Sequence, residues 1–169
     1  MAEAAFFFLI AVAAIASAVG MLVARSPINS ALWLVLNLFC IAAAYILLNA
    51  EFVGIIQILV YAGAIMVLFL FVIMLLNLDE FPSVKTIEWK KVFAYGLGII
   101  VLSQLVYVVA LAADALPAGV NSEQAAELGT ATNLGIELFS KYAFHLEIIA
   151  VLLLAATIGA VLLAKKRFV

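Results

Sequence analysis

The chain has 169 residues, of which 70% are hydrophobic and 11% are charged, and its mean hydropathy is +1.37. A soluble domain of this size must coat its surface with polar and charged residues, so the composition excludes a soluble protein and indicates an integral membrane protein. The formal net charge is −2, and no basic stripe runs along the chain, which excludes nucleic-acid binding.

Five apolar segments have the length of roughly 20 residues that a helix needs to cross the hydrocarbon core of a bilayer. They cover about residues 4–24, 29–49, 53–77, 92–114 and 144–164. Helix is the only fitting structure, because an open sheet would leave backbone groups unpaired in lipid. We therefore predict an all-α integral membrane protein, a single domain over residues 1–169, with a long outer loop over 115–143.

Short polar breaks predict how the spans are connected. Pro27 lacks a backbone donor and is suited to open the second helix, and the hairpin over residues 49–51 is so short that spans two and three should be antiparallel neighbours. Within the long outer loop, residues 122–128 and 136–142 have the pattern of short interfacial helical turns. The first span follows Met1 without the basic region of a signal peptide, and we interpret it as a retained helix.

Lysine and arginine fall almost entirely on one side of the predicted membrane. One side carries seven basic residues and the other only Lys141. The seven are Arg25, Lys85, Lys90, Lys91, Lys165, Lys166 and Arg167. By the positive-inside rule, the N-terminus faces outward and the C-terminus is cytoplasmic. No repeat relates the spans, which disfavours a free-standing transporter built from paired halves.

The third span is polar at its beginning and apolar in its second half. Gln57 and Tyr61 are four residues apart and share a helix face with Gly54, whereas residues 62–76 contain no charged group. Tyr61 suits either a relay of hydrogen bonds between waters or a contact with a neighbouring helix. Gly63 favours close packing of a second helix and also permits a π-bulge. The pattern indicates a helix that is wettable at one end and dry at the other.

Two acidic residues are candidates for a proton path. Glu147 lies about one turn inside the fifth span, and a carboxylate near the centre of a membrane helix costs about 2.5–3.5 kcal/mol. It indicates either a wet or partnered functional site, or a side chain that reaches the interface or pairs with Lys141 or His145. Glu51, at the tip of the short hairpin, suits the entrance of such a path or simply an interfacial position.

No motif in the sequence predicts a bound cofactor or metal. The single cysteine, Cys40, lies in an apolar run and suits a packing role, and His145 is the only histidine and has no ligand set around it. Neither a glycine-rich nucleotide loop nor a Walker lysine is present in the sequence. We therefore expect no redox centre, catalytic residue or metal site in this chain itself.

Three segments together resemble one family of membrane proteins. They are similar, in this order, to the second, third and last conserved helices of the subunit J (chain 6) family of NADH–quinone oxidoreductase, respiratory complex I. The segments are NSALWLVLNL at 29–38, VYAGAIMVLFLFVIMLLN at 60–77 and EIIAVLLLAATIGA at 147–160. The five-span topology with an outward N-terminus also agrees, and the resemblance covers about residues 20–78 and 133–165.

The resemblance implies a subunit in the membrane arm of a redox-driven proton pump (a sodium pump in some relatives). NADH, FMN, iron–sulfur clusters and quinone would be bound by other subunits, and the location would be the bacterial inner (plasma) membrane. The partners would include the small subunit K and the quinone-site subunit. The family's third helix can carry a π-bulge, expected here over Tyr61–Met66, whose change to regular α-helix is associated with the opening of a water path.

Taken together, the residues and the resemblance give five candidates for the proton path or its gate: Tyr61, Gly63, Glu51, Gln57 and Glu147. Some members of the family carry a glutamate at the position of Gln57. Because glutamine cannot store a proton, storage would fall to Glu51 or Glu147 in this chain. The alternative is a purely structural subunit that the complex needs for assembly and that has no role in the proton path.

Overall fold

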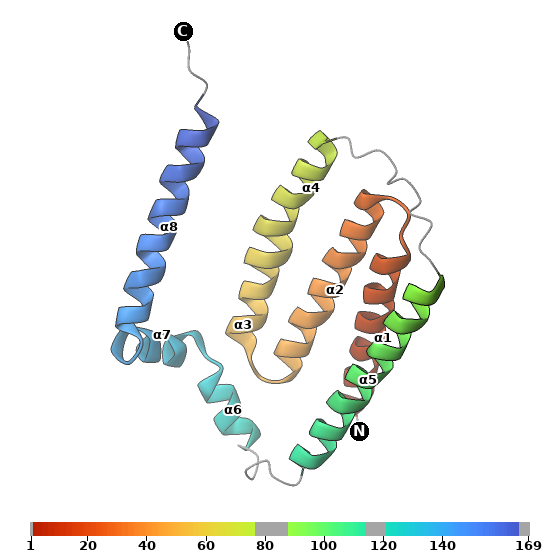
Figure 1. The fold of residues 1–169 in the computed structure, drawn as a ribbon. Helices are drawn as coiled ribbons and strands as arrows, with labels where there is room; N and C mark the ends of the chain where they lie inside the picture. Colours follow the sequence, from red (N-terminus) through yellow and green to blue (C-terminus); the bar gives the residue numbers. More distant parts are fainter. Residues whose placement is uncertain (1, 77–87, 114–120, 166–169) are drawn as a thin grey trace.

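The computed structural model describes residues 2–76, 88–113 and 121–165, and every element within these ranges is helical (Figure 1). Five helical stretches are long and apolar enough to cross a membrane. They are Glu3–Val23, Pro27–Leu47, Glu51–Leu76, Val92–Leu111 and Ala143–Ala164. The prediction of five membrane helices is therefore confirmed, while the expected ends of two spans, at residues 77 and 114, lie outside the described residues.

The first two membrane helices form an antiparallel hairpin, α1 (Ala2–Val23) and α2 (Pro27–Leu47). As expected, Pro27 occupies the first turn of α2, and the Oγ of Ser26 caps this helix by accepting a hydrogen bond from the N–H of Asn29 at 3.2 Å. This cap stabilises a sharp reversal of the chain, which brings α1 and α2 into contact.

A small polar cluster joins α1 to α2 inside the membrane. The Nδ2 of Asn37 donates to the carbonyl of Ala14 at 2.8 Å and to the Oγ of Ser17 at 3.1 Å. The Oγ of Ser17 in turn donates to Ala14 O at 2.9 Å, and Ser17 is fully buried. Every polar group that the hairpin buries here therefore has a partner, as the membrane interior requires.

The third membrane helix runs antiparallel to α2 and consists of three parts: α3 (Glu51–Ile56), a π-helix η1 (Gln57–Ile65) and α4 (Met66–Leu76). The turn before it reverses at Asn49, whose φ of 61° lies in the left-handed region that asparagine tolerates. Gly54 lies against α2 so closely that a Cβ there would come within 2.7 Å of Ile46 Cγ1. The third helix is thereby held on α2 near its beginning.

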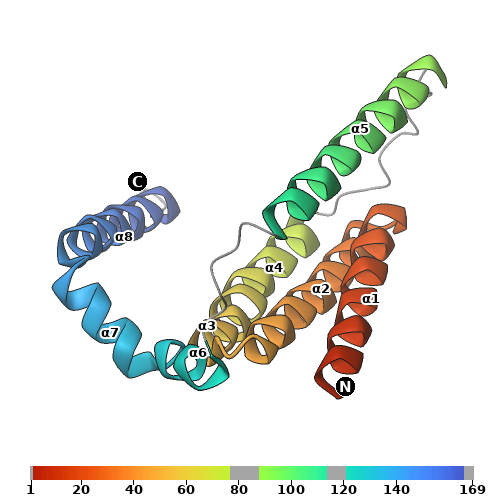
Figure 2. The same cartoon turned by 90° about the horizontal axis from the view of Figure 1, so that it is seen from below.

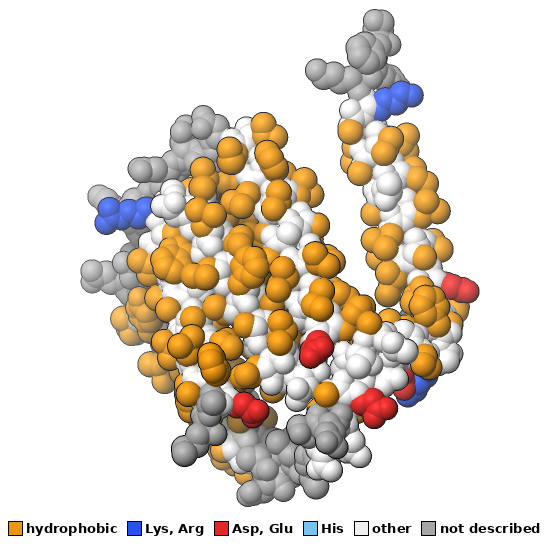
Figure 3. Space-filling view, turned by 180° about the vertical axis from the view of Figure 1, so that it is seen from behind, with side chains coloured by type: hydrophobic (Ala, Val, Ile, Leu, Met, Phe, Trp, Pro, Cys, Tyr) orange, Lys and Arg blue, Asp and Glu red, His pale blue; other side chains and the backbone are white. Residues whose placement is uncertain are grey.

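The remaining membrane helices are α5 (Glu88–Ala113) and α8 (Ala143–Ala164). α8 stands apart from the bundle of α1 to α4 in both ribbon views, whereas α5 overlaps α1 in Figure 1 and extends away from it in Figure 2. The described apolar side chains of α5 and α8 are mostly exposed; Leu163, for example, is 90% exposed. Apolar side chains cover the surface of the bundle and of α8 as well (Figure 3). Such surfaces fit lipid or the helices of other membrane proteins.

Two short helices lie in the connection between α5 and α8. The first, α6 (Ser122–Leu128), has the predicted bounds, but the second, α7 (Ala131–Ser140), begins five residues earlier than the predicted turn at 136. The reason is Thr130, whose Oγ1 caps α7 by accepting from the N–H of Asn133 at 3.4 Å. α6 and α7 lie at the end of the molecule where α2 turns into α3 (Figure 1).

Candidate functional site

The third membrane helix changes its hydrogen bonding at Gln57. From there to Ile65 it is a π-helix, and at its end the N–H of Met66 reaches back to the carbonyl of Tyr61, an i→i+5 bond. The sequence led us to expect a π-bulge over Tyr61–Met66, so the observed segment overlaps it and begins four residues earlier. π-Helical turns are rare and occur mostly at functional sites.

Gly63 lies near the end of this π-helix and helps to permit it. A Cβ at Gly63 would come within 3.3 Å of the carbonyl oxygen of Ile58, which is tighter than ordinary contact. Glycine also weakens a regular α-helix relative to alanine by about 0.5–1 kcal/mol. The local sequence therefore lowers the cost of leaving α-helical geometry at this position.

The π-helix rests on α2 through small and flexible side chains. Ala62 is 7% exposed and Met66 is 5% exposed, and both lie on the third helix where η1 joins α4. α2 is the element that packs against α3, η1 and α4. An alanine and a methionine at a helix contact leave room for small rotations, because methionine readily adapts its shape.

The polar residues of the third helix are not all turned the same way. Gly54 faces α2, Gln57 is partly buried, and Tyr61 is 50% exposed. A residue of an α-helix turns the chain by about 100°, and a residue of a π-helix turns it by less. Tyr61 is therefore rotated away from the helix face on which Gly54 lies. Neither Gln57 nor Tyr61 forms a side-chain hydrogen bond within the described residues, which leaves both available to water or to another subunit.

The third helix becomes entirely apolar after the π-helix. α4 has the sequence MVLFLFVIMLL and contains no side chain that binds water well. The change of backbone geometry therefore coincides with the border between the polar and the apolar half of the helix. Because α4 is apolar on every side, its rotation would not expose a polar face of its own. The rotation would instead change which apolar side chains of α4 lie next to the polar residues that precede it.

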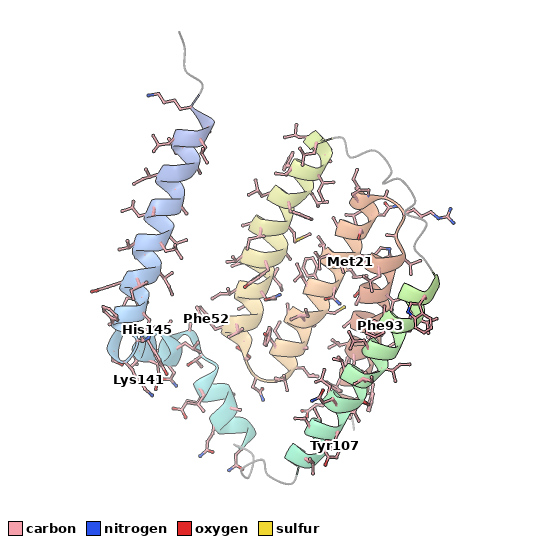
Figure 4. All side chains as sticks on the ribbon, viewed as in Figure 1. Met21, Phe52, Phe93, Tyr107, Lys141 and His145 are labelled. Carbon is pink, nitrogen blue, oxygen red and sulfur yellow. The ribbon has the colours of Figure 1, made fainter. Side chains whose placement is uncertain are left out.

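The two candidate acids lie on different elements and are not brought together. Glu51 is the exposed first residue of α3, whereas Glu147 is exposed in the second turn of α8, which packs on α7. Glu147 forms no ion pair with Lys141 or His145, although both lie at the same end of α8 (Figure 4). Lys141 instead holds its Nζ 5.6 Å from the centre of the Tyr142 ring.

Two features near this site were not predicted from the sequence. Asn37 lies in an apolar span, where an amide is a signal for an interhelical hydrogen bond. Gly129 ends α6, and it contacts the turn between α2 and α3. In the sequence, only its position after a short helical pattern distinguishes Gly129.

Among the described residues no group of three His, Cys, Asp or Glu could hold a metal ion.

Comparisons with known proteins agree on one family. Residues 17–163 match the family model of the NADH-ubiquinone/plastoquinone oxidoreductase chain 6. The chain is 34% identical to the NADH-quinone oxidoreductase subunit J of Rhodobacter capsulatus, over 95% of this chain and 81% of the relative. It is 35% identical to the protein of the same name from Escherichia coli (strain K12), over 91% and 82%.

A third relative has a different electron donor in its name. The chain is 32% identical to the F(420)H(2) dehydrogenase subunit J of Methanosarcina mazei, over 96% of this chain and 91% of the relative. The likeness therefore extends across relatives named for NADH and for F(420)H(2).

Proposed function

The chain belongs to the NADH-ubiquinone/plastoquinone oxidoreductase chain 6 family, and on this premise we propose that it couples quinone reduction to proton translocation from within the membrane. It is a multi-pass membrane subunit of NADH-quinone oxidoreductase. Electrons would pass from NADH through FMN and iron–sulfur clusters to quinone in other subunits. This chain would contribute a gate in the bacterial plasma membrane, beside the small subunit K and the quinone-site subunit.

The observation that carries the proposal is the π-helix η1. Changing the i→i+5 bonds of this segment, of which the bond from Met66 N–H to Tyr61 O is the last, into i→i+4 bonds removes one residue from the wide turns. The parts of the helix on either side then rotate relative to each other by about 100°, the angle of one α-helical residue. A helix with two such hydrogen-bonding patterns is a two-state element that a distant redox event can bias.

The rotation acts at the border between polar and apolar surface. Tyr61 and Gln57 would form the wettable side, with Glu51 at the entrance, and α4 would form the dry wall that blocks or uncovers the path. Gln57 relays hydrogen bonds but does not store a proton, so a stored proton would reside on Glu51 or Glu147. Glu147 supports this role because it is an acid in a membrane helix without an ion-pair partner among the described residues.

The experiment that tests the gate is a pair of conservative variants in the complete complex. Tyr61→Phe removes a hydroxyl and Glu147→Gln removes a proton site, and both keep the side chain's size. We expect normal assembly and fewer protons pumped per electron, measured in sealed vesicles. The matched controls are Tyr107→Phe in α5 and Glu137→Gln in α7, which lie outside the proposed path.

A second candidate function is a purely structural role in assembly. The exposed apolar helices α5 and α8 favour it, because they need lipid or partner helices to cover them. Normal proton pumping in both Tyr61→Phe and Glu147→Gln, together with failed assembly when the chain is deleted, would favour this scaffold over the gate.

A further inference from the structure

The first turn of the third membrane helix has no cap from its own neighbourhood. Ala50 stands at the N-cap position and makes no side-chain hydrogen bond, so the first N–H groups of α3 need other partners. One partner comes from far along the chain: the N–H of Phe52 donates to the carbonyl of Gly129 at 3.4 Å. Figure 4 labels Phe52 at the end of α3 that faces α6 and α7.

Gly129 also touches the turn that precedes α3. A Cβ at this position would collide with the carbonyl oxygen of Asn49, the residue with the left-handed backbone. The obstacle is backbone rather than a flexible side chain, so it could not move aside easily. Gly129 is therefore held by two backbone contacts against the hairpin between α2 and α3, and only glycine leaves the room for both.

The segment that carries Gly129 is itself well braced. We call residues 127–130, between α6 and α7, the α6–α7 corner. Its carbonyl at Glu127 accepts hydrogen bonds from Asn133 Nδ2 at 2.7 Å and from Thr130 Oγ1 at 2.8 Å. The N–H of Gly129 donates to Ala125 O at 3.0 Å. The corner is thus a built structure rather than a loose loop that happens to pass the hairpin.

We propose that the α6–α7 corner anchors the first turn of the third membrane helix, with Gly129 as the positioning residue, so that rearrangement of η1 turns α4 and leaves α3 in place. The inference rests on the proposed function. A change from π to α hydrogen bonding fixes only the relative rotation of the two flanking parts. Because η1 begins at Gln57, little more than one turn beyond Phe52, holding Phe52 directs the rotation to α4.

The test compares Gly129→Ala with Gly135→Ala in the complete complex. Gly135 lies in α7 with nothing within 4 Å of a Cβ, so its variant is a matched control for adding one methyl group. Amide hydrogen exchange is measured over residues 50–56 and 66–76, in the resting complex and during turnover. Proton pumping per electron is measured on the same samples, together with the rate of quinone reduction.

In the unaltered complex, we expect exchange over 50–56 to be the same at rest and in turnover, and exchange over 66–76 to differ. Gly129→Ala should raise exchange over 50–56 by up to about tenfold, the effect of losing a backbone hydrogen bond. It should also lower the protons pumped per electron while quinone reduction continues. Gly135→Ala should change none of these quantities, because it leaves the anchor intact.

Four results would contradict the inference or the function on which it rests. Unchanged exchange over 50–56 in Gly129→Ala, or an equal rise in Gly135→Ala, would show that the corner is no anchor. If Gly129→Ala fails to assemble, the test uses hydrogen exchange in the unaltered complex alone. Exchange over residues 50–56 that differs between rest and turnover would contradict the anchor. Exchange over 66–76 that never varies contradicts the switch, and so the proposed function, even where 50–56 is protected.

Discussion

At the scale of single residues, Asn37 has the clearest energetic role. Its Nδ2 bonds two oxygens on α1, Ala14 O and Ser17 Oγ, so one amide connects two membrane helices. Hydrogen bonds between membrane helices contribute on average about 0.6 kcal/mol, with a maximum near 1.7. The value is modest because the separated helices also find partners for their polar groups.

We expect Asn37→Leu to lower the free energy of unfolding of the chain in lipid bicelles by about 1 kcal/mol, since both bonds are lost. Ser103→Ala is the control: the Oγ of Ser103 bonds only Ile100 O within α5, at 2.8 Å. The free energy of unfolding of Ser103→Ala should differ from that of the unaltered chain by only about a few tenths of a kcal/mol. Equal losses in the two variants would mean that the contact between α1 and α2 does not depend on Asn37.

Candidate residues could be found in the sequence more readily than their surroundings. Glu147 and Tyr61 stand out because a polar group in an apolar span is costly. Their neighbours depend on helix rotation, which periodicity gives only for a regular helix. The π-geometry of η1 changes that rotation, so the face shared by Gly54 and Tyr61 in a regular helix is divided in the structure.

At the scale of the element, we expect Gly63 to influence which hydrogen-bonding pattern η1 prefers. Gly63→Ala favours the regular α-helix by about 0.5–1 kcal/mol through propensity, and it crowds Ile58 O in the π form. We therefore expect the variant to shift the third helix toward α-helix and to lower proton pumping per electron. A structure of the assembled variant complex would show whether the N–H of Met66 now bonds Ala62 O.

Gly98→Ala in α5 provides the control, because nothing lies within 4 Å of a Cβ there. Both substitutions add one methyl group to a glycine of a membrane helix. If Gly63→Ala kept the π-helix and pumped normally, the glycine would not set the balance between the two forms.

Hydropathy predicts the existence of the membrane helices well but their internal form poorly. Apolar length must match the bilayer, so the five spans follow from the sequence with bounds close to those observed. The start of η1 at Gln57 could not be predicted, because hydropathy does not distinguish i→i+4 from i→i+5 hydrogen bonding within an apolar helix. The predicted start of α7 at residue 136 is wrong, because the hydroxyl of Thr130 caps the helix five residues earlier.

At the scale of the whole molecule, the arrangement has two distinct ends. The N-terminus, the turn between α2 and α3, and the helices α6 and α7 lie at one end, and the turn between α1 and α2 lies at the other (Figure 1). This grouping is the one that the distribution of lysine and arginine requires, with Lys141 alone on its side. Which end faces the cytoplasm stays a prediction from charge.

Reporter fusions test that orientation. We expect alkaline phosphatase to be active when fused within residues 121–142, and green fluorescent protein to be fluorescent when fused after Val169. By the positive-inside rule, the seven basic residues of the opposite side are expected to keep the corresponding loops in the cytoplasm. The reverse pattern of activity would contradict the predicted topology without affecting the fold.

The sparse packing of α5 and α8 on the bundle could not be predicted from the sequence. A sequence shows that a helix is apolar, but it does not show whether lipid, the same chain or another subunit covers it. In the described residues α8 packs on α7, and its membrane face has no other partner in the chain. Within the described residues, few contacts therefore fix the positions of these two helices.

The unequal packing of the helices has a consequence for biogenesis. α1, α2 and the third helix can pack together as soon as they are synthesised, whereas among the described residues α5 gains little packing from the chain and α8 packs on the short helix α7. In a cell that lacks the neighbouring subunits, α5 and α8 would stay largely unpacked, and we expect membrane proteases to degrade the chain in this incompletely assembled form. The level of this polypeptide should then follow the supply of its companions more closely than that of its own messenger RNA.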